Sequence, residues 1–111
     1  MPTDPLQVLR VGALQIHRAR HRVRIDGRDV AVTRTELALL WALARTPVEA
    51  VSRDALLDEA WGEDAEVGPR AVDIHIARLR RKLRAAARGS SAPIIETVWG
   101  IGYQLRSRGA E

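Results

Sequence analysis

The chain has 111 residues, of which 18 are Lys or Arg, 14 are Asp or Glu and none is Cys. This length suits one domain, and 46% hydrophobic residues can form its core without disulfides. The lack of Cys excludes thiol catalysis, zinc fingers and iron–sulfur clusters. No apolar run reaches the roughly 18 residues of a membrane span and no signal peptide begins the chain, so we expect a cytoplasmic protein without membrane contact. The net charge of +4 permits binding to a polyanion without requiring it.

The first third of the chain alternates apolar and polar residues, as β-strands do. Three pairs of apolar residues stand two positions apart: Leu14 and Ile16, Val23 and Ile25, and Val30 and Val32. Together with the turn signal Asp26-Gly27, they predict a small antiparallel sheet between Leu6 and Val32 with one solvated face. We interpret Arg18, Arg20, Arg22 and Arg24 as polar surface of that sheet.

From Thr33 the apolar spacing becomes helical. Thr33 and Glu36 form a capping-box pair before a helix expected over residues 34–45, with Trp41 on its buried side. Ser52 is the expected N-cap of a second helix of about two turns that Gly62 ends, with Trp61 packed under the following loop. That loop, residues 62–68, is acidic. Pro69 then suits the first position of a third helix that runs to about Ala87, before Gly89.

The end of the chain predicts a hairpin, with strands at residues 94–98 and from Tyr103, joined by Gly100-Ile101-Gly102. The fold class is therefore α+β, in the order strands, three helices and hairpin. We expect one domain over residues 6–106, with flexible ends at 1–5 and 107–111.

The third helix separates apolar from basic residues. One stripe contains Val72, Ile76, Leu79 and Leu83, and the opposite face contains Arg70, Ile74, Ala77, Arg78 and Arg81, with Arg80 and Arg84 on one flank and His75 and Lys82 on the other. Between Arg70 and Arg88 there are seven Lys or Arg and one acid, Asp73. Such a concentration of positive charge is typical of an element that lies against phosphates, although basic faces are also often only solvated.

Two residues of this helix bear on the choice between partners. An exposed Ile74 favours DNA, because it could touch a thymine methyl in a major groove; the alternative is a protein contact, which would make the chain an interaction module whose basic helix docks on an acidic partner. Asp73 could accept a hydrogen bond from cytosine, orient an arginine, or complement the helix dipole in the first turn.

The sequence offers little for catalysis: His17, His21 and His75 have no metal-ligand spacing, and no phosphate loop or nucleophile elbow is present. We expect no enzyme, metal or cofactor.

Ordered motifs extend over about 90 residues. They are Asp26-Gly27, Thr33-x-x-Glu36-x-x-Leu39-Leu40, Val51-Ser52-Arg53-x-x-Leu56-Leu57, Trp61-Gly62, the third-helix run from Arg70 to Leu83, and the hairpin run from Ile95 to Tyr103. In this order they resemble the C-terminal effector domain of OmpR/PhoB-type response regulators, a winged helix-turn-helix. The resemblance implies a four-stranded N-terminal antiparallel sheet, three helices and a hairpin wing. It also implies sequence-specific binding of double-stranded DNA by a two-component transcription regulator.

The resemblance further implies roles for individual residues. The third helix, about 69–87, would be the recognition helix in the major groove, and the wing, about 94–106, would lie on the backbone or minor groove. By position, Arg70 and Arg80 resemble phosphate contacts, Asp73, Ile74 and Arg78 resemble base-facing residues, and Thr97 resembles a backbone contact. We add Arg81 from the helical projection. Trp99 stands where many members carry an Arg that enters the minor groove, and is expected to stack on the sugar–phosphate backbone or pack beneath the wing. Ala71 replaces a common Thr and Leu37 a common Phe.

Partners also follow from the resemblance. The loop residues Glu63, Asp64, Ala65, Glu66 and Val67 correspond to the family's transactivation loop, which meets RNA polymerase. Members of the family usually bind direct repeats as head-to-tail pairs, promoted by phosphorylation of an N-terminal receiver domain. For this chain, that phosphorelay control is expected only in a longer parent protein.

Overall fold

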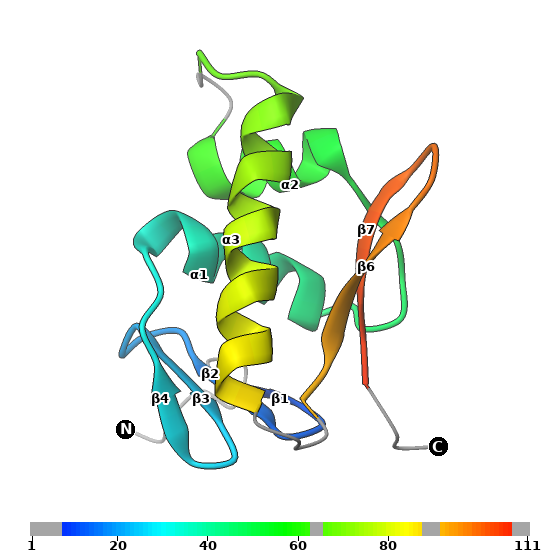
Figure 1. The fold of residues 1–111 in the computed structure, drawn as a ribbon. Coiled ribbons are helices and arrows are strands. Elements are labelled where there is room, and N and C mark those ends of the chain that lie inside the picture. The colour runs from blue at the N-terminus through cyan, green and yellow to red at the C-terminus, as the bar shows by residue number, and fades with distance from the viewer. Residues whose placement is uncertain (1–7, 63–65, 88–91, 108–111) are drawn as a thin grey trace.

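The computed structural model describes residues 8–62, 66–87 and 92–107 (Figure 1). The elements are β1 (Val8–Val11), β2 (Leu14–His17), β3 (Arg22–Ile25), β4 (Arg28–Val30), α1 (Arg34–Ala44), β5 (Val51–Ser52), α2 (Arg53–Trp61), α3 (Pro69–Ala87), β6 (Ile94–Val98) and β7 (Gly102–Arg106). The N-terminal sheet lies at one end of the helices and the C-terminal hairpin stands beside α3. The predicted order of strands, three helices and hairpin is confirmed.

The N-terminal sheet has four antiparallel strands in chain order, β1-β2-β3-β4. Its register places Leu14 opposite Ile25 and Ile16 opposite Val23, and all four side chains are buried. On the other face, Arg22 and Arg24 pair with Asp29 at 3.6 and 3.2 Å, as expected of a polar sheet surface.

Two details of this sheet differ from the expectation. Arg18 and Arg20 lie in the β2–β3 connection rather than on the sheet face, and Arg18 stacks on the Trp41 ring at 5.2 Å. The last strand ends at Val30, so Val32 is not part of it. The reason is local: Thr33 is already the N-cap of α1, and the chain must leave the sheet before it.

Helix α1 begins with the predicted capping box. The Thr33 hydroxyl accepts the Glu36 N–H at 3.1 Å, and the Glu36 carboxylate accepts the Thr33 N–H at 2.9 Å. Glu36 is only 1% exposed and also accepts a 2.6 Å hydrogen bond from Lys82 of α3. Burial raises the pKa of Glu36, but the hydrogen bonds from Lys82 and Thr33 outweigh it and hold the pKa below its ordinary value. This ion pair fastens the start of α1 to the C-terminal half of α3.

Helix α3 has the predicted bounds, and its apolar stripe is fully packed. Val72, Ile76 and Leu79 are 0% exposed and Leu83 is 3% exposed. They join a core that includes Leu39, Leu40, Leu43, Leu56 and Trp41. Burying one such side chain is worth about 1.5–3 kcal/mol, so the stripe sets the rotation of α3 and leaves its opposite face to solvent. No helix in the described ranges is both long and apolar enough to cross a membrane.

The hairpin belongs to a three-stranded sheet in the order β5-β7-β6, which the sequence did not predict. β5 consists only of Val51 and Ser52, immediately before α2, and it pairs with Tyr103 and Gly102 of β7. A Cβ at Gly102 would collide with the carbonyl oxygen of Val51, so this position requires glycine. The second hairpin strand consequently begins at Gly102, one residue earlier than expected. The hairpin is thus hydrogen-bonded to the segment that leads into α2.

Candidate nucleic-acid interface

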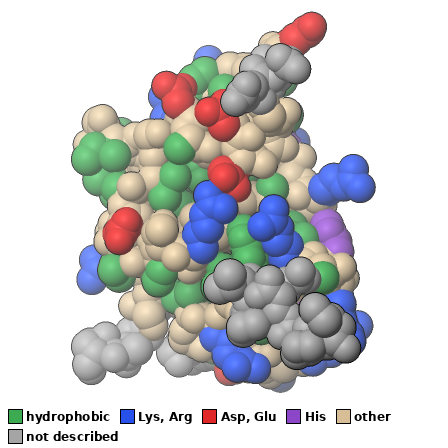
Figure 2. Space-filling model, turned by 180° about the vertical axis from the view of Figure 1, so that it is seen from behind, with side chains coloured by type: hydrophobic (Ala, Val, Ile, Leu, Met, Phe, Trp, Pro, Cys, Tyr) green, Lys and Arg blue, Asp and Glu red, His purple; other side chains and the backbone are tan. Residues whose placement is uncertain are grey.

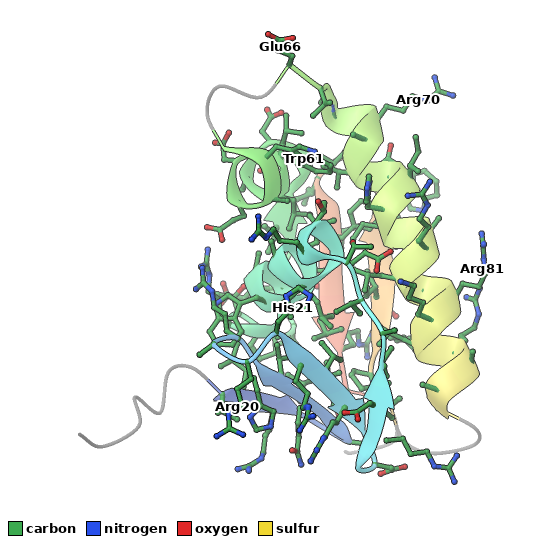
Figure 3. All side chains as sticks on the ribbon, turned by 90° about the vertical axis from the view of Figure 1, so that its left-hand side faces the viewer. Arg20, His21, Trp61, Glu66, Arg70 and Arg81 are labelled. Carbon is green, nitrogen blue, oxygen red and sulfur yellow. The ribbon has the colours of Figure 1, made fainter. Side chains whose placement is uncertain are left out.

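The outward face of α3 is basic and open to solvent. Its exposed residues are Arg70, Ile74, Ala77, Arg78, Arg81 and Arg84. Figure 3 shows Arg70 and Arg81 pointing away from the rest of the molecule on the same side of α3. Within the described ranges, no ion pair joins Arg70, Arg78 or Arg81 to an acid. Ile74 is 48% exposed amid these cations. Four predicted site residues thus share the exposed face of α3, namely Arg70, Ile74, Arg78 and Arg81, and Arg80 lies on its flank.

Arg80 is half-buried and holds the hairpin against α3. Its Nε donates to the Ile95 carbonyl and its Nη2 to the Thr97 hydroxyl, each at 2.8 Å. Its guanidinium also stacks 5.3 Å from the centre of the Tyr103 ring. A hydroxyl that accepts one hydrogen bond still has its own proton to donate, so Thr97 can bind an anionic oxygen while Arg80 holds it. The structure therefore brings two predicted site residues, Arg80 and Thr97, into direct contact.

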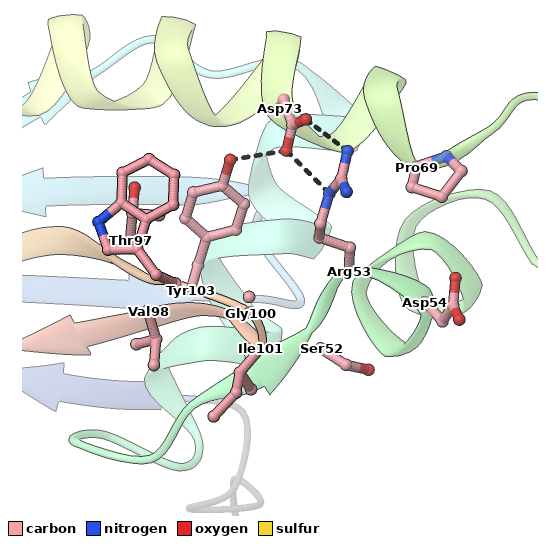
Figure 4. Close-up of a pocket in the computed structure, with 12 residues that line it drawn as sticks. Ser52, Arg53, Asp54, Pro69, Asp73, Thr97, Val98, Gly100, Ile101 and Tyr103 are labelled. Carbon is pink, nitrogen blue, oxygen red and sulfur yellow. Dashed lines mark hydrogen bonds and ion pairs between the residues drawn. The ribbon is translucent and has the colours of Figure 1, made fainter.

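Asp73 faces the protein's own donors (Figure 4). Its carboxylate accepts hydrogen bonds from Arg53 at 3.2 and 2.6 Å and from the Tyr103 hydroxyl at 2.6 Å. The expected alternative that Asp73 orients an arginine agrees with this contact. The helix-dipole explanation is wrong, because the first turn of α3 contains no acid and Asp73 lies beyond it. We call Asp73, Arg53 and Tyr103 the α2–α3–wing junction, since each residue comes from one of those elements.

The junction also changes the chemistry of Tyr103. Burial, together with the hydrogen bond to the Asp73 carboxylate, raises the pKa of Tyr103 to about 12. The phenol therefore keeps its proton, and with it the hydrogen bond to Asp73, to a higher pH than an ordinary tyrosine would.

Arg53 and Tyr103 are the contacts of the candidate site that sequence reasoning missed, although both stand in the quoted motifs. One signal was available for Arg53. It occupies the first position of α2, where a positive charge is unfavourable beside the helix dipole, and such a residue calls for an acidic partner.

An open groove of about 520 Å³ lies between the N-terminal half of α3 and the hairpin. Its lining includes Arg53, Asp73, Thr97, Trp99, Ile101 and Tyr103. Trp99 is 89% exposed at the hairpin turn, so the expectation that it packs beneath the wing is wrong. Trp99 lies within the turn itself, which closes with a hydrogen bond from the Ile101 N–H to the Val98 carbonyl at 3.0 Å.

The acidic loop before α3 is described only in part. Glu66 and Val67 are exposed, and Glu66 lies at the end of the molecule, beyond the start of α3 (Figure 3). The other predicted loop residues, Glu63, Asp64 and Ala65, lie outside the described residues. The neighbouring helix α2 exposes Asp54, Asp58 and Glu59, and acidic side chains gather in the same upper half of the molecule in Figure 2. Trp61 at the end of α2 contacts His75 edge-on, with 5.2 Å between ring centres. The described residues contain no group of three or more His, Asp or Glu that could hold a metal ion.

Helices α2 and α3 packed on α1, with a hairpin at their side, define a winged helix-turn-helix. The family described as "Transcriptional regulatory protein, C terminal" matches residues 27–105, and the chain belongs to this family. The resemblance to OmpR/PhoB-type effector domains is confirmed.

Individual relatives agree with this assignment. The chain is 40% identical over 100 residues to the phosphate regulon transcriptional regulatory protein PhoB of Rhizobium meliloti, covering 90% of this chain and 43% of the relative. It is 39% identical over 103 residues to ResD of Bacillus subtilis, covering 93% and 42%. The chain thus spans less than half the length of these curated relatives.

Solved structures extend the comparison. The DNA-binding domain of CpxR from E. coli is 35% identical, with a TM-score of 0.77 and coverage of 92% of this chain and 98% of that one. The Klebsiella pneumoniae RstA DNA-binding domain, solved in complex with the RstA box, is 31% identical, with a TM-score of 0.74 and coverage of 90% and 97%.

Proposed function

We propose that this chain binds double-stranded DNA sequence-specifically, as the effector domain of a bacterial two-component transcription regulator with no reaction of its own. DNA binding follows from the family to which the chain belongs. The open basic face of α3 supports the proposed mode of binding. The buried stripe sets the rotation of α3, and Arg80 holds the wing beside it. Helix α3 would enter the major groove and the wing would contact the backbone or adjacent minor groove.

Within this proposal the residues have separate roles. Arg78 and Ile74 face base edges, because they lie mid-helix on the open face, where an arginine suits guanine and an aliphatic group suits a thymine methyl. Arg70, Arg81 and Thr97 contact phosphates. Arg80 does so as well, since its guanidinium has five N–H donors and the wing occupies only two.

We assign Asp73 a positioning role rather than a base contact. Both carboxylate oxygens already accept hydrogen bonds from Arg53 and Tyr103. A cytosine amino group would have to compete with these charged and hydroxyl donors. Asp73 therefore acts by orienting α3 relative to α2 and the wing.

Selection of binding sites from a random duplex library at near-physiological salt tests the function directly. Enrichment of a short motif, repeated at about 10–10.5 base pairs, is the expected result and supports tandem binding. With three cationic phosphate contacts per domain, log K should fall with log salt at a slope of about −3, at 0.9 per phosphate. A folded sample that enriches no motif and binds duplexes only weakly would favour the alternative, an interaction module for an acidic protein.

Variants then test the roles. Arg78→Ala should cost about 1–3 kcal/mol and relax the preference at one position, whereas Arg81→Ala should weaken all sequences alike and reduce the salt slope by about 1. Arg20→Ala is the matched control, because it removes the same charge from the β2–β3 connection, away from the outward face of α3 (Figure 3). Equal losses from all three variants on every sequence would contradict the assignment and indicate attraction by net charge alone.

The other proposed partners belong to a longer parent protein of which this chain would be one domain. Because the relatives are more than twice as long, we propose a receiver domain in a longer cytoplasmic parent, head-to-tail pairing on direct repeats, and contact of loop residues 63–67 with RNA polymerase. The exposed acid Glu66 offers a test. Glu66→Ala should leave DNA affinity unchanged and lower transcription from a promoter with the selected site. Unchanged transcription would remove Glu66 from the polymerase contact.

A further inference from the structure

The tip of the wing carries two large apolar side chains in solvent. Trp99 is 89% exposed and Ile101 is 55% exposed, one on each side of Gly100. The Ile101 N–H donates to the Val98 carbonyl at 3.0 Å, and Gly100 has φ +81°, which closes the chain into a tight four-residue turn. In Figure 2 apolar side chains mark the edge of the molecule where the hairpin projects. The indole therefore contributes almost nothing to the core of this domain.

The tip is held at a fixed place relative to α3. Strand β6 pairs with β7 along five residues, β7 pairs with β5, and Arg80 fastens Ile95 and Thr97 to the helix. The junction at Asp73 adds a contact from Tyr103 of β7. Trp99 and the N-terminal half of α3 also line the same groove, so a partner that fills this groove would meet both.

We propose that Trp99, flanked by Ile101, is an apolar wedge that inserts into the minor groove beside the site contacted by α3 and partly unstacks a base step. The inference rests on the proposed function. Thr97 is the expected phosphate contact, and Trp99 follows two residues later. At about 3.3 Å per residue the tip lies roughly 7 Å beyond Thr97, past the phosphate line and toward the groove.

The chemistry of the tip selects wedge insertion over charge-based recognition. An indole and a branched aliphatic side chain have no charge to bind phosphate or to follow the potential of a narrow groove. Apolar side chains in minor-groove proteins instead enter between base pairs and kink the duplex. Trp99 would therefore confer a preference for easily unstacked pyrimidine–purine steps, TA and CA/TG, at the edge of the operator.

Site selection with the wild-type domain and the variants Trp99→Ala and Trp99→Arg tests this proposal. The wild type should enrich a pyrimidine–purine step at a constant distance from the α3 motif. Trp99→Ala should keep the α3 motif and lose this edge step, whereas Trp99→Arg should exchange it for an A·T run, because arginine favours a narrow minor groove. The same edge sequence in all three selections would overturn the proposal.

Fluorescence and affinity measurements on the selected duplex complete the test. 2-Aminopurine placed at the edge step should brighten on binding of the wild type and not of Trp99→Ala. Removal of a base-stacking aromatic should weaken binding by roughly ten-fold to a hundred-fold, with the salt slope unchanged because no charge is lost. Val48→Ala is the control, since Val48 is a 65% exposed apolar residue outside the wing. An equal affinity loss without brightening or edge preference would indicate stacking on the sugar–phosphate backbone and refute the wedge.

The two proposals fail in different ways. If the wild type binds a motif, Arg78→Ala relaxes the preference at one position of it and Trp99→Ala changes neither the edge sequence nor the affinity, only the wedge is wrong. If the wild type binds no duplex specifically, the proposed function itself fails. Trp99→Ala should unfold at the wild-type temperature, because the side chain is almost entirely in water.

Discussion

Replacing Asp73 with Asn should loosen the α2–α3–wing junction without changing its shape. The carboxylate accepts three hydrogen bonds, and an amide at this place offers one oxygen and turns an NH₂ group toward the donors. The pair with Arg53 is partly exposed and is worth about 0.5 kcal/mol. The bond from Tyr103, a residue that is 8% exposed, is charge-assisted and worth about 1.5–2 kcal/mol. Asp73→Asn should therefore lower the free energy of unfolding by about 2 kcal/mol.

Urea unfolding of a double-mutant cycle measures this value. Tyr103→Phe should cost about 1.5 kcal/mol alone and much less in the Asp73→Asn background, because the same hydrogen bond is removed in both. Asp54→Asn, in the exposed first turn of α2, is the control and should stay within about 0.5 kcal/mol of wild type. Additive losses, or an Asp73→Asn variant as stable as the control, would refute the reasoning. On DNA, Asp73→Asn should weaken binding with the motif unchanged; a new base at one position would instead make Asp73 a base contact.

Three further predictions concern titration and strain. The folded-state pKa of Glu36 is lowered, so its ion pair with Lys82 stabilises the fold above the ordinary pKa of 4.5 and is lost as pH falls through the folded value. The wild type should therefore lose stability below pH 4.5 more steeply than Glu36→Gln. Parallel acid unfolding curves for the two proteins would contradict this. Because the pKa of Tyr103 is raised from 10.0 to about 12, its contribution to the free energy of unfolding is complete below pH 10 and is lost between pH 10 and 12. Absorbance at alkaline pH should show the tyrosine of the folded domain ionising near pH 12. Ionisation near pH 10 would disprove the contact with Asp73. Val48 is exposed and has φ +62°, which strains a β-branched residue; Val48→Asn should raise the unfolding free energy by about 1 kcal/mol in thermal denaturation, and Val48→Ile should not.

The elements that were predictable are those with a local signal. The α3 stripe repeats over several turns, so its buried and exposed faces could be assigned from periodicity alone. The capping box of Thr33 and Glu36 and the Asp26-Gly27 turn depend on neighbours in the sequence, and both are present. Strand β5 has two residues, too few to show a period, and it exists only because β7 supplies its partners about 50 residues later.

The sequence predicted which charged residues of the candidate site are exposed, but not which residues bind one another. Exposure of Arg70, Arg78 and Arg81 follows from the helical projection. The partners of Asp73 are 20 and 30 residues away, and Lys82 is 46 residues from Glu36. Such contacts depend on how the helices pack, and no pattern along the chain reports them. For the same reason the sequence predicted only a phosphate contact for Arg80 and not its hydrogen bonds to Ile95 and Thr97.

The two-residue strand β5 sets the spacing between the helix pair and the wing. It links the segment that enters α2 to the wing strand β7 at Gly102, where no larger residue fits, and so holds the wing next to the helix pair. In the proposed complex, α3 and the wing would contact the DNA at two points whose separation is set by the fold. A single base pair inserted between those points in the operator would displace one contact by about 3.4 Å and rotate it around the duplex. The domain would then reject a target in which every favoured base is present but wrongly spaced.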